Sequence, residues 1–470
     1  MNKFTAFGFT LALNLCFSTA GAAPLSEDEH AFRALYKELV EINTTLSVGS
    51  CTEAATAMSK HLVAAGIPEA EVHIIVPEAF PRQGNLVATL RGTDKSTDAV
   101  LLLAHIDVVE ANRADWERDP FTLIEEDGYF FGRGTADDKG MAAIFVDVMK
   151  RMAQSGYQPA RTIKLALTCG EETPNTFNGA SYLIKHHFDL IDAAFAINEG
   201  GGGRLDHNGQ AFSHSVQAGE KVYQDFTLEV TNPGGHSSRP VKENAIYRLI
   251  DGLKKISGYS FPVEFNDTTR GYFDQVSKLE SGQVSTDMQA ILSTPPDANA
   301  LDRLMNIAGY NSILHTTCVT TMLDAGHAPN ALPQRAQANV NCRIFPGHTQ
   351  EEIRQQLISI VSDDQVSIMF TDPPESTSPP PPLTREIMGP IERLTEEMWP
   401  GVPVIPRMIA GGTDGRFLTP AGIPTYGVSG IFSKPGTVNA HGLNERLNVN
   451  SLYKGRLFLD RLIKIYAGGE

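Results

Sequence analysis

The stretch from Leu101 to Gly140 constrains the fold of this chain more than any other. It begins as an apolar strand, Leu101-Leu102-Leu103-Ala104, that runs directly into His105-Ile106-Asp107. It ends in the glycine-rich segment Gly132-Arg133-Gly134-Thr135-Ala136-Asp137-Asp138-Lys139-Gly140. A buried strand that carries polar side chains at its C-terminal end, followed by a turn that leads into a helix, is typical of an open α/β sheet with its site at the strand ends.

Two later strands repeat this arrangement. The apolar segment 163–168 leads into Cys169-Gly170-Glu171-Glu172, and the segment 193–198 leads into Glu199 and a run of glycines. Apolar residues spaced by three and four predict a helix over 141–152 that packs on the sheet. Further helices are predicted at 27–42, 51–65 and 179–187, and further strands at 72–76 and 85–91. The pattern predicts an α/β domain whose acidic side chains gather at one sheet edge.

The pattern changes near residue 215. Phe226, Leu228 and Val230 alternate with polar residues, which predicts a half-exposed strand rather than a buried parallel one. Helical or irregular structure is predicted up to about residue 309, strands at 318–322 and 336–345, and a Pro-rich segment, 373–382, follows. We therefore expect a signal peptide, a catalytic domain in two parts and an inserted α+β domain between them, with the chain divided into residues 1–23, 24–214, 215–376 and 377–470.

Length and charge limit the kinds of protein that this chain can be. Its 470 residues exceed the length at which one core usually stops growing, about 250 to 300 residues, so two domains are expected. The net charge of -16 argues against nucleic acid or an anionic membrane as partner, because both need basic patches. The charge gives no positive indication of the substrate.

The N-terminus predicts a cleavable export signal. Lys3 supplies a positive charge, Phe7 to Phe17 an apolar run, and Ala20-Gly21-Ala22 the small residues of a cleavage site after residue 22 or 23. The apolar run is shorter than the roughly 20 residues that span a bilayer, so no stable membrane insertion is expected, and an uncleaved anchor is the alternative. Leu15 is too bulky for lipid attachment at Cys16. We expect a periplasmic or secreted protein.

Removal of the signal leaves Cys51, Cys169, Cys318 and Cys342. An exported protein can form disulfides, but four cysteines are too few for a disulfide scaffold in a chain of this length. Cys169 sits in a hydrophobic strand, where a buried free thiol is expected. Cys318 and Cys342 are close enough in sequence to be a candidate pair, and the sequence leaves their pairing open. No cysteine cluster has the spacing of a zinc site.

The polar residues at the predicted sheet edge suit metal ions. On a strand, His105 and Asp107 point to the same face, so that the carboxylate can orient an imidazole that binds an ion. The glycine-rich turn allows Asp137 to bridge two ions about 3.5 to 4 Å apart. Of Glu171 and Glu172, one offers a ligand and the other a base that takes a proton from water.

Glu199 and His441 complete a set of oxygen and nitrogen ligands suited to a pair of zinc ions. Each fragment has a structural alternative when taken alone. The His-x-Asp tripeptide can be purely structural, Asp137 and Asp138 can cap a helix, and the Glu171-Glu172 pair can be a solvated acidic turn. The combination favours a metal-dependent hydrolase.

Together these motifs resemble the zinc exopeptidase family that includes bacterial glutamate carboxypeptidase, carboxypeptidase S, aminoacylase, succinyl-diaminopimelate desuccinylase and carnosinase-type dipeptidases. The resemblance runs from about Leu101 to His441. It is fullest over 101–140, which contains Trp116, Asp119-Pro120-Phe121, Asp127-Gly128 and Gly132-Arg133-Gly134. It implies an α/β fold with a mixed sheet flanked by helices and an inserted α+β lid domain. Glu110 replaces the family's usual proline after His-x-Asp-x-Val, a departure that we expect to be harmless.

The resemblance implies a role for each residue at the metal centre. His105 and Glu199 would hold one of two zinc ions per chain, Glu172 and His441 would hold the other, and Asp137 would bridge both. Asp107 would orient His105, and Glu171 would act first as general base and then as general acid. Cobalt and manganese accept similar ligands, so the native metal stays open.

The resemblance also implies substrate contacts outside the metal centre. In the lid, His236 of Gly234-Gly235-His236 would stabilise the oxyanion, often across a dimer interface. Asn330, in Asn330-Ala331-Leu332-Pro333, and Arg343 resemble the lid's asparagine and the arginine that binds the substrate carboxylate. The loop Gly411-Gly412-Thr413 resembles the family's substrate-backbone loop.

These roles imply an exported zinc exopeptidase that cleaves a peptide next to a free carboxylate. An aminoacylase acting on N-acyl amino acids uses the same chemistry and is the alternative. A metal-binding protein that has lost catalysis is the third, and the presence of Glu171 and of every expected ligand argues against it. The segment between His236 and Asn330 is long, as in the carboxypeptidase S and aminoacylase branches, which weakens the inference of a homodimer through the lid.

Overall fold

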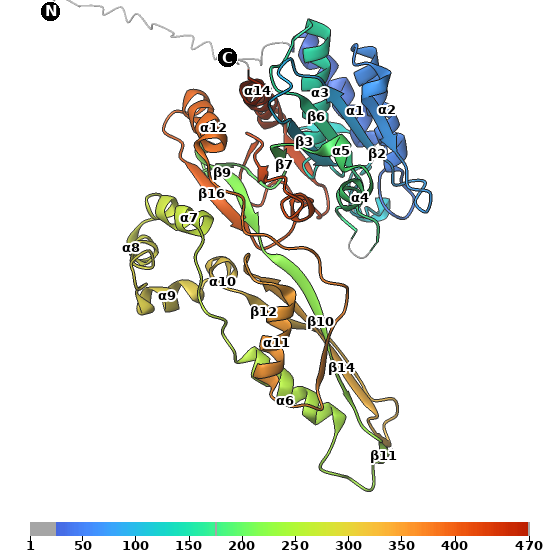
Figure 1. Ribbon diagram of the computed structural model, residues 1–470, viewed down its shortest axis with the longest axis vertical. Helices are drawn as coiled ribbons and strands as arrows, with labels where there is room; N and C mark the ends of the chain where they lie inside the picture. Colours follow the sequence, from blue (N-terminus) through green and yellow to red (C-terminus); the bar gives the residue numbers. More distant parts are fainter. Residues whose placement is uncertain (1–24, 174–175, 469–470) are drawn as a thin grey trace, which may run out of the picture.

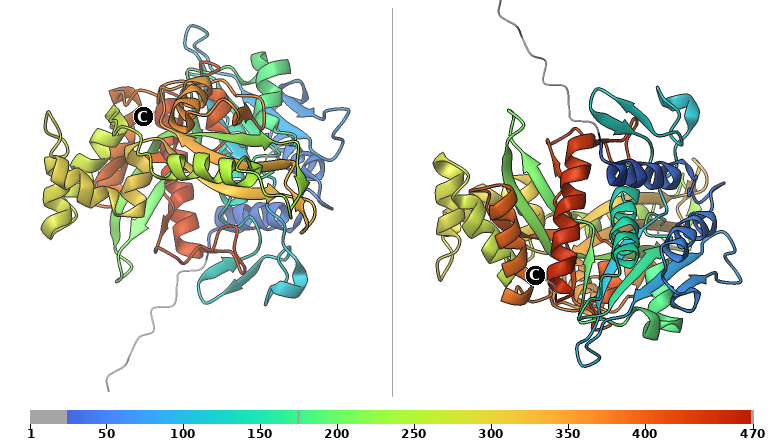
Figure 2. Two further views of the ribbon diagram at one scale, coloured as in Figure 1. Left: turned by 90° about the horizontal axis from the view of Figure 1, so that it is seen from below. Right: turned by 90° about the horizontal axis from the view of Figure 1, so that it is seen from above.

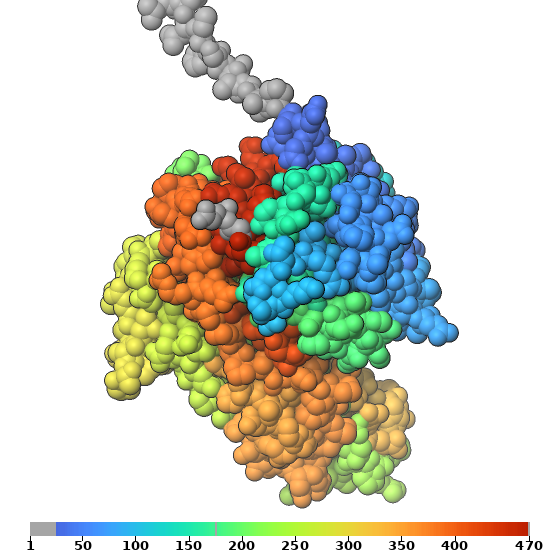
Figure 3. All heavy atoms as spheres, turned by 45° about the horizontal axis from the view of Figure 1, so that its top comes forward, coloured from blue at the N-terminus to red at the C-terminus, as the bar shows by residue number. Residues whose placement is uncertain are grey.

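The computed structural model of the protein describes residues 25–173 and 176–468. Figure 1 shows a catalytic part, which contains β3, β6 and β7, and an elongated inserted part that extends away from it. The N-terminal and C-terminal segments of the chain lie side by side on the catalytic part, as the blue and red surfaces in Figure 3 show. The catalytic part is therefore built from both ends of the chain.

A ten-stranded mixed sheet forms the centre of the catalytic part. Its strands follow the order β1-β2-β6-β3-β7-β17-β9-β8-β18, and β16 pairs with β9. The neighbours β6, β3, β7 and β17 are parallel, whereas β1 and β2 are antiparallel additions at one edge. The strands are β1 (Val72–Ile75), β2 (Asn85–Leu90), β3 (Val100–His105), β6 (Ile163–Thr168), β7 (Phe195–Asn198), β8 (Gly202–Leu205), β9 (Ala211–Glu220), β16 (Val404–Ile409), β17 (Thr425–Gly427) and β18 (Phe432–Ser433).

Helices cover both faces of this sheet, which is why its central strands are largely apolar. Along β3, Val100, Leu102 and Ala104 join the larger apolar cluster, and Leu101 and Leu103 join the cluster on the opposite face. The larger cluster contains α1 (Glu27–Glu41), α2 (Cys51–Ala64), α3 (Lys139–Ser155), α12 (Arg385–Met398) and α14 (Val449–Tyr466), of which α1, α3 and α14 are seen in Figure 2. The other contains α4 (Gly179–His186), α5 (Phe188–Ile191) and α13 (Gly415–Leu418). The predicted fold class is confirmed.

A small sheet connects the two ends of the catalytic part. It consists of β4 (Ile124–Glu126), β5 (Tyr129–Phe131) and β19 (Arg446–Asn448), with β5 in the middle. Because Arg446 pairs with Phe131, the segment that follows His441 lies beside the glycine-rich turn that begins at Gly132. Two short 3-10 helices, Glu69–Glu71 and Arg113–Asp115, lie outside both sheets.

The inserted part contains an antiparallel sheet of order β12-β14-β10-β15. Its strands are β10 (Val222–Thr231), β12 (Thr317–Ala325), β14 (Arg335–Ile344) and β15 (Ser367–Phe370), and α6 (Ala245–Ser257) and α11 (Gln350–Val361) pack on it. Buried and partly buried side chains alternate along most of β10, as expected for a half-exposed strand. A separate group of helices packs near β16: α7 (Asp267–Ser277), α8 (Gly282–Ala290), α9 (Ala298–Met305) and α10 (Ala308–Leu314). The two short strands β11 (Gly235–His236) and β13 (Ala331–Leu332) pair with each other.

The chain enters the inserted part at Lys221, between the end of β9 and the start of β10. Residues 215–220, which we assigned to the inserted domain, belong to β9 of the large sheet. They are hard to assign from sequence because β9 and β10 are both long strands that follow each other without a turn-forming segment.

The described part of the chain contains two disulfides. Cys51 at the start of α2 is bonded to Cys169 just after β6, with the Cα atoms 6.1 Å apart. The prediction of a buried free thiol at Cys169 was therefore wrong, because the fold brings together residues that are 118 positions apart in sequence. The second disulfide joins Cys318 to Cys342, which are directly opposite each other on β12 and β14.

Among the described residues, no helix is long and apolar enough to cross a membrane. The predicted export signal at 1–23, including Cys16, lies outside the described residues.

Candidate metal centre

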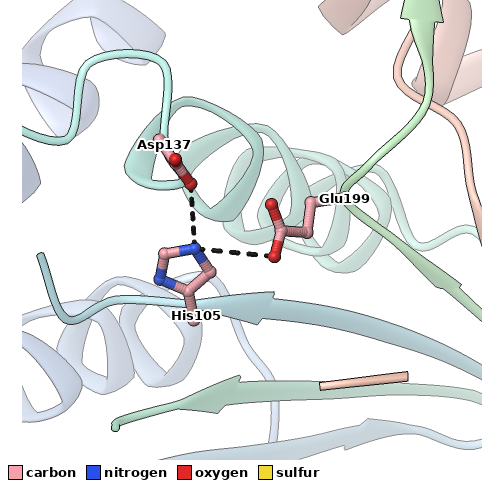
Figure 4. A group of neighbouring side chains, drawn as sticks. All are labelled: His105, Asp137 and Glu199. Carbon is pink, nitrogen blue, oxygen red and sulfur yellow. Dashed lines mark hydrogen bonds and ion pairs between the residues drawn. The ribbon is translucent and has the colours of Figure 1, made fainter. Parts of the chain in front are cut away.

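The five predicted metal ligands converge at the C-terminal edge of the parallel strands. They form two groups, and within each group the ligand atoms lie within 4.8 Å of one another. The first group comes from the end of β3, the turn before α3 and the end of β7, as Figure 4 shows. The groups are His105, Asp137 and Glu199, and Asp137, Glu172 and His441.

Asp137 belongs to both groups, and its two oxygens face different imidazoles. His105 Nε2 lies 3.1 Å from Asp137 Oδ1 and 3.7 Å from Glu199 Oε1. His441 Nε2 lies 3.1 Å from Asp137 Oδ2 and 2.9 Å from the Glu172 carboxylate. This is the arrangement that a carboxylate bridging two cations requires.

The donor atoms fit zinc. Imidazole nitrogen and carboxylate oxygen are common zinc ligands. The Nδ1 of His105 lies 3.1 Å from the backbone carbonyl of Asp107, which accepts its proton and leaves Nε2 free to bind an ion. A cleft of about 400 Å³ is lined by two of the proposed ligands, Asp137 and Glu199, together with Arg204, Arg407 and other residues.

Asp107 supports the centre differently from the sequence prediction. β3 ends at His105, so Asp107 lies in the loop that follows and not on the strand. Its carboxylate is 3.7 Å from His105 Nδ1 and accepts hydrogen bonds from the backbone N–H groups of Glu171 (3.3 Å) and Glu172 (3.0 Å). Asp107 therefore orients His105 through its carbonyl and holds the Glu171-Glu172 turn through its side chain.

Without bound cations, burial and neighbouring charges raise the pKa of several acidic and imidazole side chains in this centre. Burial raises the pKa of Glu171 to about 8, and the charges of Asp414 and Glu172 add to the rise. Burial also raises the pKa of Glu199 well above its usual range. Hydrogen bonds to Asp137 and Glu172 raise the pKa of His441 to about 10. Bound cations favour the ionised carboxylates and neutral imidazoles, so they reverse these shifts.

Asp138, the neighbour of the bridging carboxylate, does not cap α3. It occupies the N-cap position, but its side chain makes no capping hydrogen bond. Its Oδ2 is buried without a hydrogen-bond partner among the described residues, and burial raises its pKa well above the usual range. The helix-capping alternative is therefore wrong for Asp138.

Arg343 contacts the residue that precedes the loop Gly411-Gly412-Thr413, and this loop contacts the residue that precedes Glu199. Arg343 is at the end of β14 nearest the large sheet, and its Nη1 donates to the Ala410 carbonyl at 3.3 Å. The side chain of Asn198, which precedes Glu199, donates to Thr413 Oγ1 at 3.2 Å. The predicted backbone-binding loop is thus connected to the end of β7, where Glu199 follows, and Arg343 is connected to the start of that loop.

His236 and Asn330 lie elsewhere. Both are exposed and neighbour the short β11–β13 pair, where Ser237 N donates to the Asn330 carbonyl at 3.1 Å. Figure 1 shows β11 at the end of the inserted part that is farthest from β3 and β7. Within one chain, the structure does not bring these two predicted residues to the metal centre.

Two buried carboxylates that support the centre were not predicted. Asp414 accepts hydrogen bonds from Thr168 Oγ1 (2.7 Å) and Asn178 Nδ2 (2.6 Å). Glu445 is fully buried beside the glycine-rich turn. The signal available in the sequence is their spacing, since Asp414 directly follows Gly411-Gly412-Thr413 and Glu445 follows His441 by four residues.

Comparison with known proteins agrees with this geometry. The sequence pattern of Peptidase family M20/M25/M40 matches residues 101–465. The chain belongs to this family. It is an M20 metallohydrolase of the peptidase and aminoacylase type, acting on amide bonds.

Three curated relatives illustrate the range of the M20 family. The human N-fatty-acyl-amino acid synthase/hydrolase PM20D1 is 30% identical over 390 residues, which cover 80% of this chain and 76% of the relative. The probable carboxypeptidase S-like 2 of Dictyostelium discoideum is 28% identical, covering 81% and 74%. Aminoacylase-1A of Rattus norvegicus is 23% identical, covering 94% and 96%.

Solved M20 structures share the fold. The metallo-carboxypeptidase Sso-CP2 from Sulfolobus solfataricus superimposes with a TM-score of 0.68 at 17% identity, covering 94% of this chain and all of the other. The YXEP protein of Bacillus subtilis, described as a dinuclear metal binding peptidase, superimposes with a TM-score of 0.58 at 13% identity, covering 94% of this chain and 99% of the other.

Proposed function

We propose that this chain is an exported di-zinc hydrolase that cleaves the amide bond preceding an amino acid with a free carboxylate. The observation that carries the proposal is the sharing of Asp137 between the two ligand groups. Glu171 belongs to neither group but is held against the centre by the hydrogen bond from its backbone N–H to Asp107. The centre thus has ligands for two ions and a separate carboxyl group for proton transfer.

The chain's own residues supply proton transfer and substrate positioning. Glu171 takes a proton from the attacking water and later returns it to the leaving amine nitrogen. Two zinc ions held by the proposed ligands would activate that water and polarise the amide carbonyl. Arg343 binds the substrate carboxylate through its planar guanidinium. His236 of a second copy of the chain donates a hydrogen bond to the oxyanion that forms at the carbonyl.

The acyl side of the substrate distinguishes two candidates. A peptide is the substrate of an exopeptidase, the function that we expected from the sequence. An N-acyl amino acid is the second candidate, and the names of the human and rat relatives favour it. A pocket beside Glu199 suits either, because its walls combine Gly412, Thr413 and Arg416 with apolar side chains of Val222, Tyr223 and the prolines 379–381.

One experiment tests this function and separates the candidates. Purified protein is assayed for metal content and for hydrolysis of a panel of dipeptides and N-acyl amino acids, before and after chelation and after return of zinc. About two metals per chain and restorable hydrolysis support the proposal, and the preferred panel member names the substrate class. Bound metal without hydrolysis of any amide refutes the catalytic role, and absence of metal refutes the ligand assignment.

We further propose that two copies associate through the inserted part, so that His236 of each serves the centre of the other. The position of His236 far from its own centre supports this. So does β12, which ends the sheet order and leaves Val319, Met322 and Leu323 exposed by 57%, 71% and 58%. Exposed apolar side chains on an open sheet edge favour pairing with another strand. Sedimentation equilibrium of the purified protein tests the dimer, and a monomer at assay concentration contradicts it.

The proposal that the protein is exported depends on the signal peptide predicted at residues 1–23. Cleavage at the proposed site predicts a mature N-terminus at Ala23 or Pro24. N-terminal sequencing of protein from the periplasm or medium tests this, and an intact Met1 in the cytoplasmic fraction contradicts it.

A further inference from the structure

A buried ion pair holds together the two loops that carry Asp137 and His441. The Glu445 carboxylate is inaccessible to solvent and is surrounded by donors from the glycine-rich turn. Its Oε2 accepts from Arg133 Nη1 at 2.7 Å and from the Gly134 N–H at 3.0 Å. Its Oε1 accepts from the N–H of Ala136 at 2.9 Å and from the N–H of Asp137 at 3.2 Å.

Arg133 extends the connection to the loop of His441. Its Nη2 donates to the carbonyl of Gly442 at 3.0 Å, so one guanidinium holds both the Glu445 side chain and the backbone next to His441. The Arg133 side chain is only 3% exposed. Because guanidinium donors lie in a fixed plane, the two contacts set the distance between the loops.

The loop of His441 needs such support. His441 has a φ of 61°, and Asn439 and Asn444 have φ of 57° and 54°. Left-handed backbone costs free energy in residues other than glycine and persists where surrounding contacts impose it. The hydrogen bonds of Arg133 and Glu445 are contacts of this kind. They hold Gly442, whose N–H closes the turn that begins at the Asn439 carbonyl, and Glu445, which follows that turn.

We propose that Arg133 and Glu445 are positioning residues, which set the separation of Asp137 and His441 and so determine how tightly the second ion is bound. Neither residue belongs to the ligand groups. The proposal rests on the ligand set of the proposed function. It adds that part of the metal affinity resides in an ion pair that contacts neither metal nor substrate, as is common for groups that orient metal ligands.

A simpler interpretation is that the pair only stabilises the fold. Arg456 and Asp147 provide a matched control for it, because they form a second buried pair in the same catalytic part, with Arg456 Nε 2.7 Å from Asp147 Oδ2 and exposed fractions of 9% and 3%. Arg456 also donates to Asp28, and it joins α14 to α3 without a hydrogen bond to either ligand loop among those described. Loss of stability alone should therefore be similar at both pairs.

The test uses Arg133→Met and Glu445→Gln, with Arg456→Met and Asp147→Asn as controls. Affinity for Zn²⁺ is measured by competition with a chromogenic chelator, and Co²⁺ absorption reports ligand geometry. We expect Arg133→Met and Glu445→Gln to weaken binding of one of the two ions by about 10- to 100-fold and to alter the Co²⁺ spectrum. We expect both controls to bind both ions within about twofold of wild type, because their pair is remote from the ligands.

Arg133→Met also separates geometry from charge. Removing a positive charge near two cation sites should strengthen metal binding if electrostatics alone mattered, whereas the positioning role predicts weaker binding. Metal affinity equal to or above that of wild type in Arg133→Met overturns the proposal. If that variant does not fold, Arg133→Lys replaces it, since an ammonium cannot reproduce the planar two-point contact and the same weakening is expected.

Failure of this proposal is distinguishable from failure of the proposed function. Wild type that binds two ions but hydrolyses no amide refutes the function, while the metal titrations of the variants still decide the positioning role. Wild type that hydrolyses amides, with all four variants binding metal normally, refutes the positioning role alone.

Discussion

The metal centre and the tip of the inserted part contrast in how completely one chain assembles them. At the centre, atoms from residues as distant in sequence as His105 and His441 meet within a few ångströms of a shared carboxylate. At the tip, His236 and Asn330 meet each other but lie far from the centre that they are proposed to serve (Figure 1). The strands of one sheet and the loops beside it bring the first set together, whereas the second set would reach a metal centre only through the proposed association with a second copy of the chain.

The difference follows from where the residues are attached. His105 ends β3, while Glu172 and Glu199 follow β6 and β7, so the parallel order β6-β3-β7 places them at one edge. His236 belongs to a separate pair of short strands at the end of a different sheet. Variants at the metal centre therefore test what a single chain does, and variants at the tip test the proposed association of two chains.

The largest effect is expected at the centre. Glu171→Gln removes the group that transfers the proton while leaving both ligand groups intact, so turnover should fall by as much as about 10⁴-fold. Metal content and the unfolding transition should match wild type. Turnover is measured with the best substrate of the panel, and near-normal turnover would contradict the assignment of Glu171 as the base.

A smaller effect, with a distinctive signature, is expected at the tip. His236→Ala removes a donor to the oxyanion and should lower kcat by about 10² to 10³-fold. Because the histidine is proposed to act across a dimer, mixing His236→Ala with Glu171→Gln should restore activity. In a random equal mixture, about a quarter of the sites combine an intact Glu171 with an intact His236 from the partner.

The mixing experiment decides whether His236 at the tip acts in the metal centre of a second copy of the chain. Recovery to about a quarter of wild-type activity supports exchange of His236 between copies of the chain. A mixture that stays inactive, although the two variants are shown to form mixed dimers, places His236 outside the partner's centre. Normal activity in His236→Ala alone removes His236 from the mechanism altogether.

The sequence allowed the strands that lead to the proposed metal centre to be predicted, because strand periodicity and strand-end polar residues are local patterns. The segments 100–105, 163–168 and 193–198 are apolar, short and followed by His or Glu, and the structure brings the residues that follow them together. His441, far along the chain, was included in the candidate ligand set, but its particular role came from the family resemblance, because its loop has no periodic pattern.

Other features depend on long-range packing that local patterns do not record. Cys51 and Cys169 meet because α2 packs beside the end of β6. Lys221 marks the change from one sheet to the other within a continuous run of strand residues, so the alternation of β10 was predicted but the end of β9 was not. The distance of His236 from the centre depends on the length and direction of β10 and β14, which composition does not determine.

The two disulfides extend the comparison to stability, since one lies in each region. Cys51–Cys169 closes a separation of 118 residues in the catalytic part, and Cys318–Cys342 closes 24 residues in the inserted part. The loop-closure entropy model gives a stabilisation free energy of about 4.9 kcal/mol for the first disulfide and about 3.4 kcal/mol for the second. The double variant Cys51→Ala, Cys169→Ala should therefore lose about 1.5 kcal/mol more stability than the double variant Cys318→Ala, Cys342→Ala. Denaturant unfolding of the two double variants measures this difference, and a larger cost for the inserted part would contradict it.

The smallest effect concerns Glu220, at the junction of the two regions. Its carboxylate accepts from the Thr413 N–H at 2.7 Å, and burial raises its pKa from 4.5 to about 7. A raised carboxyl pKa means that the folded state binds more protons than the unfolded state between these values, so this contribution to stability is present below pH 4.5 and is lost as the pH rises through 7.

Glu220→Gln removes that titration. Its free energy of unfolding relative to wild type should therefore increase by about 1 kcal/mol between pH 5 and pH 8, a value reduced to allow for the partial exposure of the side chain. Urea unfolding at the two pH values measures the change, and Glu78→Gln, a substitution of the same kind on the exposed surface, is the control. Parallel behaviour of the two variants would show that Glu220 is ionised in the folded protein at both pH values, and that the junction between the two regions carries a permanent charge.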